Sequence, residues 1–166
     1  MSAAPEIVTR AEQPYVAVRG RVSMAELGPF AVRTGEVFAW LGARGLAPAG
    51  APILKYNVID MARQLEVEAG VPVAAAVDGG GDGGIISGVL PAGRYATVTH
   101  VGHPSELAGV TGALLDWAAG QGLTWDMSRD GDAERWGSRL EFYLTDPAEE
   151  PDMSKWETQL AFRLAD

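Results

Sequence analysis

The chain has 166 residues and a formal net charge of −9 at pH 7, from 22 acidic and 13 basic side chains. Nucleic acids are bound through clusters of Lys and Arg, and the sequence has none, so we expect no direct binding of DNA or RNA. The absence of cysteine excludes disulfides, thiolate catalysis and Cys-ligated metal centres. No apolar run reaches the ~20 residues that span a bilayer, and no signal peptide is recognisable, so we expect a cytoplasmic protein without membrane contact.

The chain is predicted to be a single domain, residues 1–166, made of two similar halves at about 6–76 and 88–166. Each half combines one strand, one helix and two further strands. In the first half these are Tyr15–Arg19, a helix that includes Pro29 and ends at Gly45, Ile53–Ile59 and Leu65–Val73. In the second half they are Tyr95–His100, a helix from Ser105 to about Gly120, Leu140–Leu144 and Trp156–Leu164. The Gly-rich segment 78–84 is predicted to be a linker.

The two predicted helices carry the clearest sign of a repeat. Trp40, Gly45 and Leu46 recur at a constant offset as Trp117, Gly122 and Leu123. In the second helix four apolar residues fall on one face at helical spacing: Leu107, Val110, Leu114 and Trp117. We interpret the pattern as a duplicated βαββ unit.

The strands alternate between apolar and polar side chains. In 140–144, Leu140 and Phe142 point to one side while Glu141 and Tyr143 point to the other. We therefore expect helices to cover the apolar face of the sheet and the second face to be mixed polar and aromatic. Because each βαββ unit has one helix, that second face is predicted to be either hydrated or a ligand site.

Several ordered motifs accompany this pattern: Leu90-Pro-Ala-Gly-Arg-Tyr95, Leu140-Glu-Phe-Tyr-Leu-Thr-Asp-Pro147 and Gly70-Val-Pro-Val73. With the helix repeat, they resemble the GyrI-like effector-binding domain, which also forms the drug-binding domain of AraC- and MerR-type multidrug regulators. The resemblance implies an α+β fold with antiparallel sheets and a central cavity for bulky, often aromatic or cationic, small molecules. It also implies acidic side chains on the cavity floor. The chain begins almost at its first strand, so we expect it to lack a DNA-binding domain of its own.

Three polar residues are candidates for the cavity. Glu141 lies between apolar neighbours, where a desolvated carboxylate suits cation recognition or general acid/base chemistry; the alternative is a solvated strand face or a pair with Arg139. The resemblance places a cavity Glu where this chain has Gln159. Glu68 is the first-half counterpart of Gln159, and is either a second cavity acid or solvent-facing beside Glu66.

The candidate cavity walls are aromatic. Tyr56 and Tyr143 are equivalent positions in the two halves, and Trp156 opens the last strand, so all three are predicted to stack against a ligand. Trp125 and Trp136 lie in a polar loop that is a lid over the cavity, an interaction surface, or a segment packed against the domain edge.

The leading hypothesis is a standalone small-molecule binding protein of the effector or multidrug type, working as a sensor through a protein partner or by sequestration, as a monomer or homodimer. Its predicted ligand contacts are Glu141, Glu68, Tyr143, Tyr56, Trp156 and Gln159. The alternative is a hydrolase of an electrophilic, cyclopropane-bearing natural product, with Glu141 as general acid or base. A third hypothesis, a protein-interaction module of the gyrase-inhibitor kind, rests on the acidic surface alone. His100 and His103 supply too few ligands for a metal site, and no cofactor is expected.

Overall fold

The computed structural model describes residues 3–77 and 84–166, so the predicted linker lies, apart from Gly84, outside the described residues. Within them, strands and helices alternate in the following order: β1 (Glu6–Arg10), β2 (Gln13–Val22), the 3-10 turn η1 (Met24–Glu26), α1 (Leu27–Ala31), α2 (Thr34–Ala43), β3 (Ile53–Ile59), β4 (Leu65–Pro72), β5 (Ile85–Leu90), β6 (Gly93–Val101), η3 (Pro104–Glu106), α3 (Leu107–Gly120), β7 (Met127–Asp130), β8 (Ala133–Trp136), β9 (Arg139–Tyr143), η4 (Met153–Lys155) and β10 (Glu157–Arg163). None of these helices combines the length and the apolar character needed to cross a bilayer.

The strands form one curled antiparallel sheet in the order β1-β6-β10-β9-β3-β4-β2-β5. The hairpin of β7 and β8 joins its central region by pairing with the end of β3. Each half of the chain runs strand, helix, strand, strand, and the order of the main strands is symmetric about the β9–β3 pair. The α+β prediction is confirmed, and the origin of the two halves by duplication stays a prediction.

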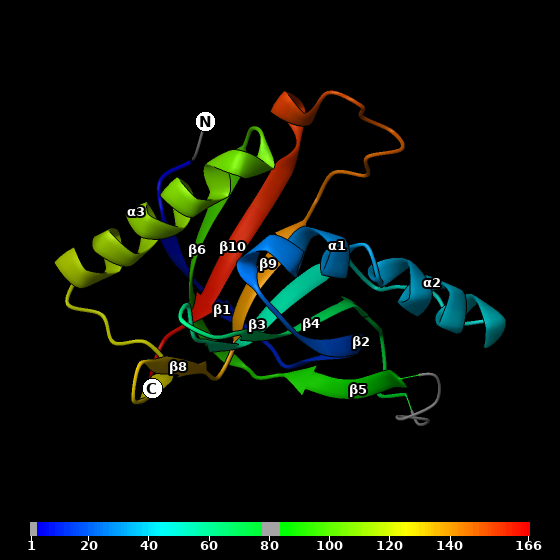
Figure 1. The fold of residues 1–166 in the computed structure, drawn as a ribbon, viewed down its shortest axis with the longest axis horizontal. Helices are drawn as coiled ribbons and strands as arrows, with labels where there is room; N and C mark the ends of the chain where they lie inside the picture. Colours follow the sequence, from blue (N-terminus) through cyan, green and yellow to red (C-terminus); the bar gives the residue numbers. More distant parts are fainter. Residues whose placement is uncertain (1–2, 78–83) are drawn as a thin grey trace.

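The helices lie on one side of the sheet, with α3 against the second half and α1 and α2 against the first (Figure 1). In the first half, Val37 and Leu41 of α2 pack in a cluster with Leu54 of β3. In the second half, Leu114 of α3 packs with Leu160 of β10. Burial of such apolar side chains is what fixes the helices on the sheet, at about 25 cal/mol for each Å² removed from water.

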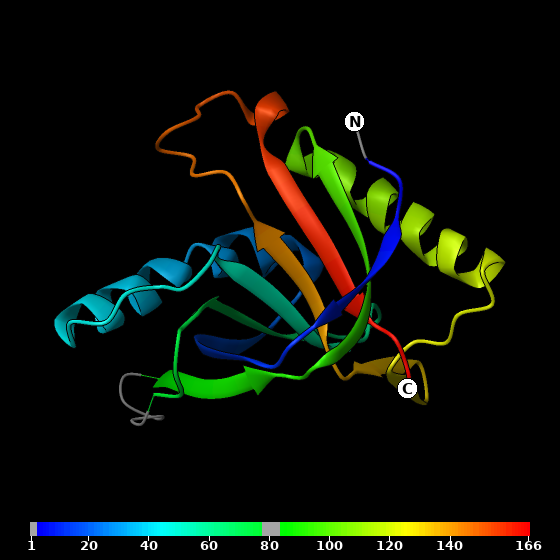
Figure 2. The same ribbon diagram turned by 180° about the vertical axis from the view of Figure 1, so that it is seen from behind.

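The expectation that helices cover the apolar face is confirmed for β4, whose Leu65 and Val67 pack in the cluster with α2, and is wrong for β9. Leu140 and Phe142 lie on the side without helices, which is seen in Figure 2, and are buried there with Tyr15, Ile53 and Tyr95. The sheet curls strongly enough for this side to cover much of itself, so it needs no helix to exclude water. The helices instead cover the face that carries Glu141 and the two tyrosines predicted to stack on a ligand.

Three local predictions also need correction. The first helix is broken: α1 ends at Ala31 and α2 starts at Thr34, whose hydroxyl donates to the Ala31 carbonyl. His103, rather than Ser105, caps the second helical segment, because its Nδ1 accepts from the Ser105 amide. Strands β1, β5, β7 and β8 were not predicted, since they are short and lie at edges or in the polar loop.

Of the aromatic residues in that polar loop, Trp136 is buried in the core and Trp125 is partly buried against it. Trp125 and Trp136 have ring centroids 5.5 Å apart, and both contact Phe162 edge-on. The lid interpretation is therefore wrong, and the alternative of packing against the domain edge is confirmed.

Candidate functional site

A groove of about 390 Å³ lies between two helical segments, η1 with α1 from the first half and η3 with α3 from the second. The central strands β3 and β9 form its floor. Met24 and Leu27 come from η1 and α1, and Pro104 and Leu107 come from η3 and α3, so the two halves face each other across it. The remaining lining residues are Tyr56, Ile59, Met61, Leu65, Ser105, Ala108, Thr111, Arg139 and Glu141. The walls are mostly apolar, and the charged groups are confined to the floor.

Glu141 is held at the floor by two phenols. The Tyr56 hydroxyl donates to Oε2 at 3.0 Å, and the Tyr143 hydroxyl donates to Oε1 at 2.9 Å. The strand register explains this arrangement: Leu54 is the partner of Glu141 across the β3–β9 pair, which places Tyr56 two residues further along the same face. Glu141 is only 8% exposed, so the carboxylate is both oriented and largely dry.

Burial raises the pKa of Glu141 above its usual value, although the hydrogen bonds from Tyr143 and Tyr56 and the charge of Arg139 oppose that shift. Burial, and then the nearby Glu141 charge, also raise the pKa of Tyr56, so this phenol stays a proton donor at neutral pH. The site thus pairs a carboxyl group that is poised to change its charge with a fixed donor.

Arg139 brings a positive charge to the same floor. Its guanidinium lies 4.4 Å from the Phe162 ring centroid and 4.9 Å from that of Trp136, and Nη1 is 3.9 Å from Glu134. Its buried Nε has no hydrogen-bond partner among the described residues. The floor therefore carries one charge of each sign, and Glu141 is the one that two neighbours orient by hydrogen bonds.

The raised pKa gives a prediction for stability. Because native Glu141 holds its proton to a higher pH than the unfolded chain does, stability falls as the pH rises through this interval. Glu141→Gln removes the buried charge while keeping an acceptor and a donor for the phenols, so its midpoint of thermal unfolding should exceed that of wild type at pH 7. The advantage should shrink in acid, where wild-type Glu141 is protonated. Thermal unfolding at a series of pH values measures this, and an advantage that grows in acid would contradict it.

Two predicted cavity residues lie on the opposite face. Glu68 pairs with Lys55, the neighbour of Leu54, so its side chain points away from the helices. It is 1% exposed and accepts hydrogen bonds from Tyr15 at 2.6 Å and Asn57 at 2.5 Å. Neither the second-acid nor the solvent-facing interpretation fits, since Glu68 is buried and fully paired.

Gln159 also faces away from the groove, because it is the register partner of Phe142. Its Oε1 accepts from Arg10 Nη2 at 2.7 Å. Trp156 lies at the start of β10, where its Nε1 donates to the Glu150 carbonyl at 2.7 Å, and it does not line the groove. Of the six residues predicted to contact a ligand, the structure thus brings only Glu141, Tyr56 and Tyr143 together. Tyr143 bonds to the carboxylate but does not line the groove.

Sequence reasoning missed several groove residues. Arg139 was detectable, since the alternation that puts Glu141 and Tyr143 on one face puts Arg139 there too. The wall residues Met24 and Leu107 carried no comparable signal, because their meeting across the groove depends on how the two helical segments sit on the sheet.

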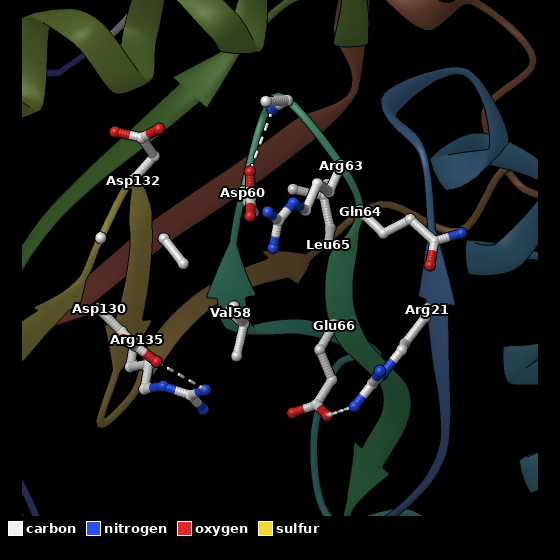
Figure 3. A pocket seen from close by; sticks show the side chains of 13 residues that line it. Arg21, Val58, Asp60, Arg63, Gln64, Leu65, Glu66, Asp130, Asp132 and Arg135 are labelled. Atoms are coloured by element: carbon white, nitrogen blue, oxygen red, sulfur yellow. Dashed lines mark hydrogen bonds and ion pairs between the residues drawn. The ribbon is translucent and has the colours of Figure 1, made fainter.

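A larger and polar hollow of about 610 Å³ lies at the end of the β3–β4 hairpin, next to the β7–β8 hairpin (Figure 3). Four of its charged side chains form two exposed ion pairs: Arg135 is 3.4 Å from Asp130, and Arg21 is 4.0 Å from Glu66. Ion pairs between exposed side chains contribute little free energy. We therefore take the smaller groove with apolar walls as the candidate functional site.

The model of a known protein family matches nearly the whole chain. The model of the GyrI-like small molecule binding domain matches residues 3–165. The chain belongs to this family. No protein with a curated functional description matches the GyrI-like chain.

Solved structures share the fold at low sequence identity. The C-terminal domain of EcmrR aligns with a TM-score of 0.75 and 18% identity over 98% of each chain. In a complex of EcmrR with DNA, the match spans 57% of the EcmrR chain. SAV2435 bound to tetraphenylphosphonium aligns with a TM-score of 0.65 and 11% identity, over 98% of this chain and 94% of that one. A structure described as a hydrolase from Listeria innocua aligns with a TM-score of 0.63 and 14% identity, over 97% of this chain and 91% of that one.

Proposed function

We propose that the groove captures a bulky, largely apolar organic cation, with Glu141 as its counter-charge. The observation that carries this proposal is a buried carboxylate, fixed by two phenols, at the bottom of a groove with apolar walls. Burial deprives the Glu141 carboxylate of the water that would solvate its charge. A cation bound next to it compensates for that loss and favours the ionised form of the carboxyl group.

The walls suit a ligand with aromatic groups. Tyr56 offers a ring next to the carboxylate, against which an aromatic group of the ligand packs. Met24 and Met61 contribute flexible thioether side chains, which adapt to ligands of different shape. These features favour a site that accepts a class of compounds rather than one metabolite.

SAV2435, which shares this fold, is bound to tetraphenylphosphonium, and this supports the same class of ligand here. The ligand contacts that we propose are Glu141 and Tyr56, with Tyr143 and Arg139 as positioning residues. Sensing through a partner or sequestration of a toxic compound are the two roles that such capture would serve.

Titration with tetraphenylphosphonium, followed by isothermal calorimetry, tests the proposal. Wild type should bind it, while tetraphenylborate, which has nearly the same shape and the opposite charge, should bind at least ~10-fold more weakly. Glu141→Gln should weaken the phosphonium by about 10–100-fold, the worth of one charged contact of about 1.5–3 kcal/mol. Glu157→Gln, an equal charge change at the exposed start of β10, is the control and should bind like wild type. Equal binding of both ions, or unchanged affinity in Glu141→Gln, would refute cation capture.

The hydrolase remains a second candidate because of one observation: the carboxyl group with a raised pKa lies 3.0 Å from a phenol donor. In such a pair, Glu141 would take a proton from an attacking water while the Tyr56 hydroxyl donates a hydrogen bond to the oxygen that gains negative charge. Opening of an activated cyclopropane by water needs such a base and such a donor. The structure described as a hydrolase supports this chemistry within the fold.

A further inference from the structure

A separate cavity of about 340 Å³ lies on the helix-free face of the sheet. The connection from β1 to β2 forms one wall, and the loop before β3 forms another, near Gly50 and Pro72. Leu140 and Phe142 of β9 and Tyr95 of β6 form an apolar floor. The sheet separates this cavity from the groove, because Glu141 lies between Leu140 and Phe142 and points to the other side.

Arg10 is the basic residue of this cavity. Its guanidinium carbon lies 4.7 Å from the Phe142 ring centroid and 5.9 Å from that of Tyr95, so the cation lies over the aromatic floor. Nη2 donates to Gln159 Oε1 at 2.7 Å, whereas the buried Nε has no partner. No hydrogen bond is found for Nη1 among residues 3–77 and 84–166.

The charge of Arg10 is not neutralised within the part of the chain that the structure describes. Arg163, another partly buried arginine, lies 2.9 Å from Asp126, whereas Arg10 has no carboxylate within 4.0 Å. Glu12 lines the same cavity but is exposed and makes no ion pair with Arg10. The residue that Arg10 does contact, Gln159, is neutral. A half-buried cation whose Nη atoms keep unpaired N–H groups, next to apolar walls, is a favourable place for an anion.

We propose that this cavity binds the carboxylate of a small amphipathic acid, which Arg10 holds through its guanidinium while the apolar part of the acid lies against the walls. A single arginine surrounded by apolar side chains suits one carboxylate better than a phosphate, which requires several donors. The cation–π contact with Phe142 and the hydrogen bond to Gln159 hold the guanidinium in place before the acid binds, so little side-chain entropy is lost on binding. This site is independent of the function proposed for the groove.

The probe is 3-phenylpropanoate, titrated into the protein and followed through backbone amide shifts in 1H–15N NMR spectra. Binding should shift amides around Arg10, Gly50 and Pro72's neighbour Val71, and 3-phenylpropanamide, the neutral analogue, should bind at least ~10-fold more weakly. Arg10→Gln should weaken the acid by about 10-fold or more. Arg10→Lys keeps the charge but loses the flat guanidinium group, and should fall between the two.

Arg94→Gln is the matched control, because Arg94 lies on the neighbouring strand β6, is exposed and does not line the cavity. It should bind 3-phenylpropanoate like wild type. Thermal unfolding shows whether each variant is folded, and tetraphenylphosphonium affinity should be the same in Arg10→Gln and wild type. The proposal is overturned if wild type does not bind 3-phenylpropanoate, if acid and amide bind equally, or if folded Arg10→Gln and Arg10→Lys both retain wild-type affinity. Loss of phosphonium binding alone would affect only the groove.

Discussion

Glu68→Ala is expected to lower the free energy of unfolding by about 3–5 kcal/mol, the usual effect of removing one partner from a buried ion pair. Glu68 accepts from Tyr15 and Asn57 and lies 3.7 Å from Lys55 Nζ, and Lys55 also donates to Asn57. Removing the carboxylate leaves a buried ammonium without its counter-charge and a buried phenol without its acceptor. Urea denaturation at pH 7 measures the loss.

Glu66→Ala is the control in the same strand. Glu66 is 27% exposed and has one ion pair, with Arg21 at 4.0 Å, so its removal should change stability by no more than about 0.5 kcal/mol. Burial lowers the pKa of Lys55, and the charge of Glu68 opposes that shift. In Glu68→Ala this pKa falls further, so the variant should regain stability as the pH rises and Lys55 loses its proton. A loss for Glu68→Ala no larger than that for Glu66→Ala would show that the network does not stabilise the fold.

If the groove is a hydrolase site, Glu141→Gln is expected to lower turnover of a spiro-cyclopropyl cyclohexadienone by about 10²–10⁴-fold, the range for loss of a general base. In this reaction water adds to the ring methylene, a ring carbon–carbon bond breaks, and its electrons convert the dienone into a phenolate. Glu141 takes the water proton while the Tyr56 hydroxyl donates a hydrogen bond to the phenolate oxygen. The proton on Glu141 then passes to the phenolate through water, so the products are an alcohol and a phenol and both side chains return to their starting state. Liquid chromatography with mass detection follows the gain of one water.

Tyr56→Phe separates this chemistry from simple capture. It keeps the aromatic wall but removes the proton donor, so turnover should fall while affinity for tetraphenylphosphonium changes little. Glu157→Gln should match wild type in both measurements. Binding of the dienone by wild type without any product would rule out the hydrolase and leave capture.

Local sequence patterns determined which segments form the main strands and helices. The range Ile53–Ile59 was predicted as the structure has it, and Leu65–Val73 differs by one residue from β4, because alternation and helical spacing are properties of neighbouring residues. The same alternation correctly placed Glu141 and Tyr143 on one face of their strand. It also correctly placed Glu68 and Leu65 on opposite faces of theirs. The ordered motifs were sufficient to identify the GyrI-like family.

Only the tertiary structure decided which face each group occupies relative to the helices. Alternation separates the two faces of a strand but does not say which one a helix covers, and in this curled sheet both faces bury apolar side chains. For this reason Glu141 proved to lie beneath the helices, while Glu68 and Gln159 lie behind the sheet. Arg10 lies at a cavity because β1 pairs with β6, more than 80 residues away along the chain. Pairing between such distant segments cannot be predicted from local sequence patterns.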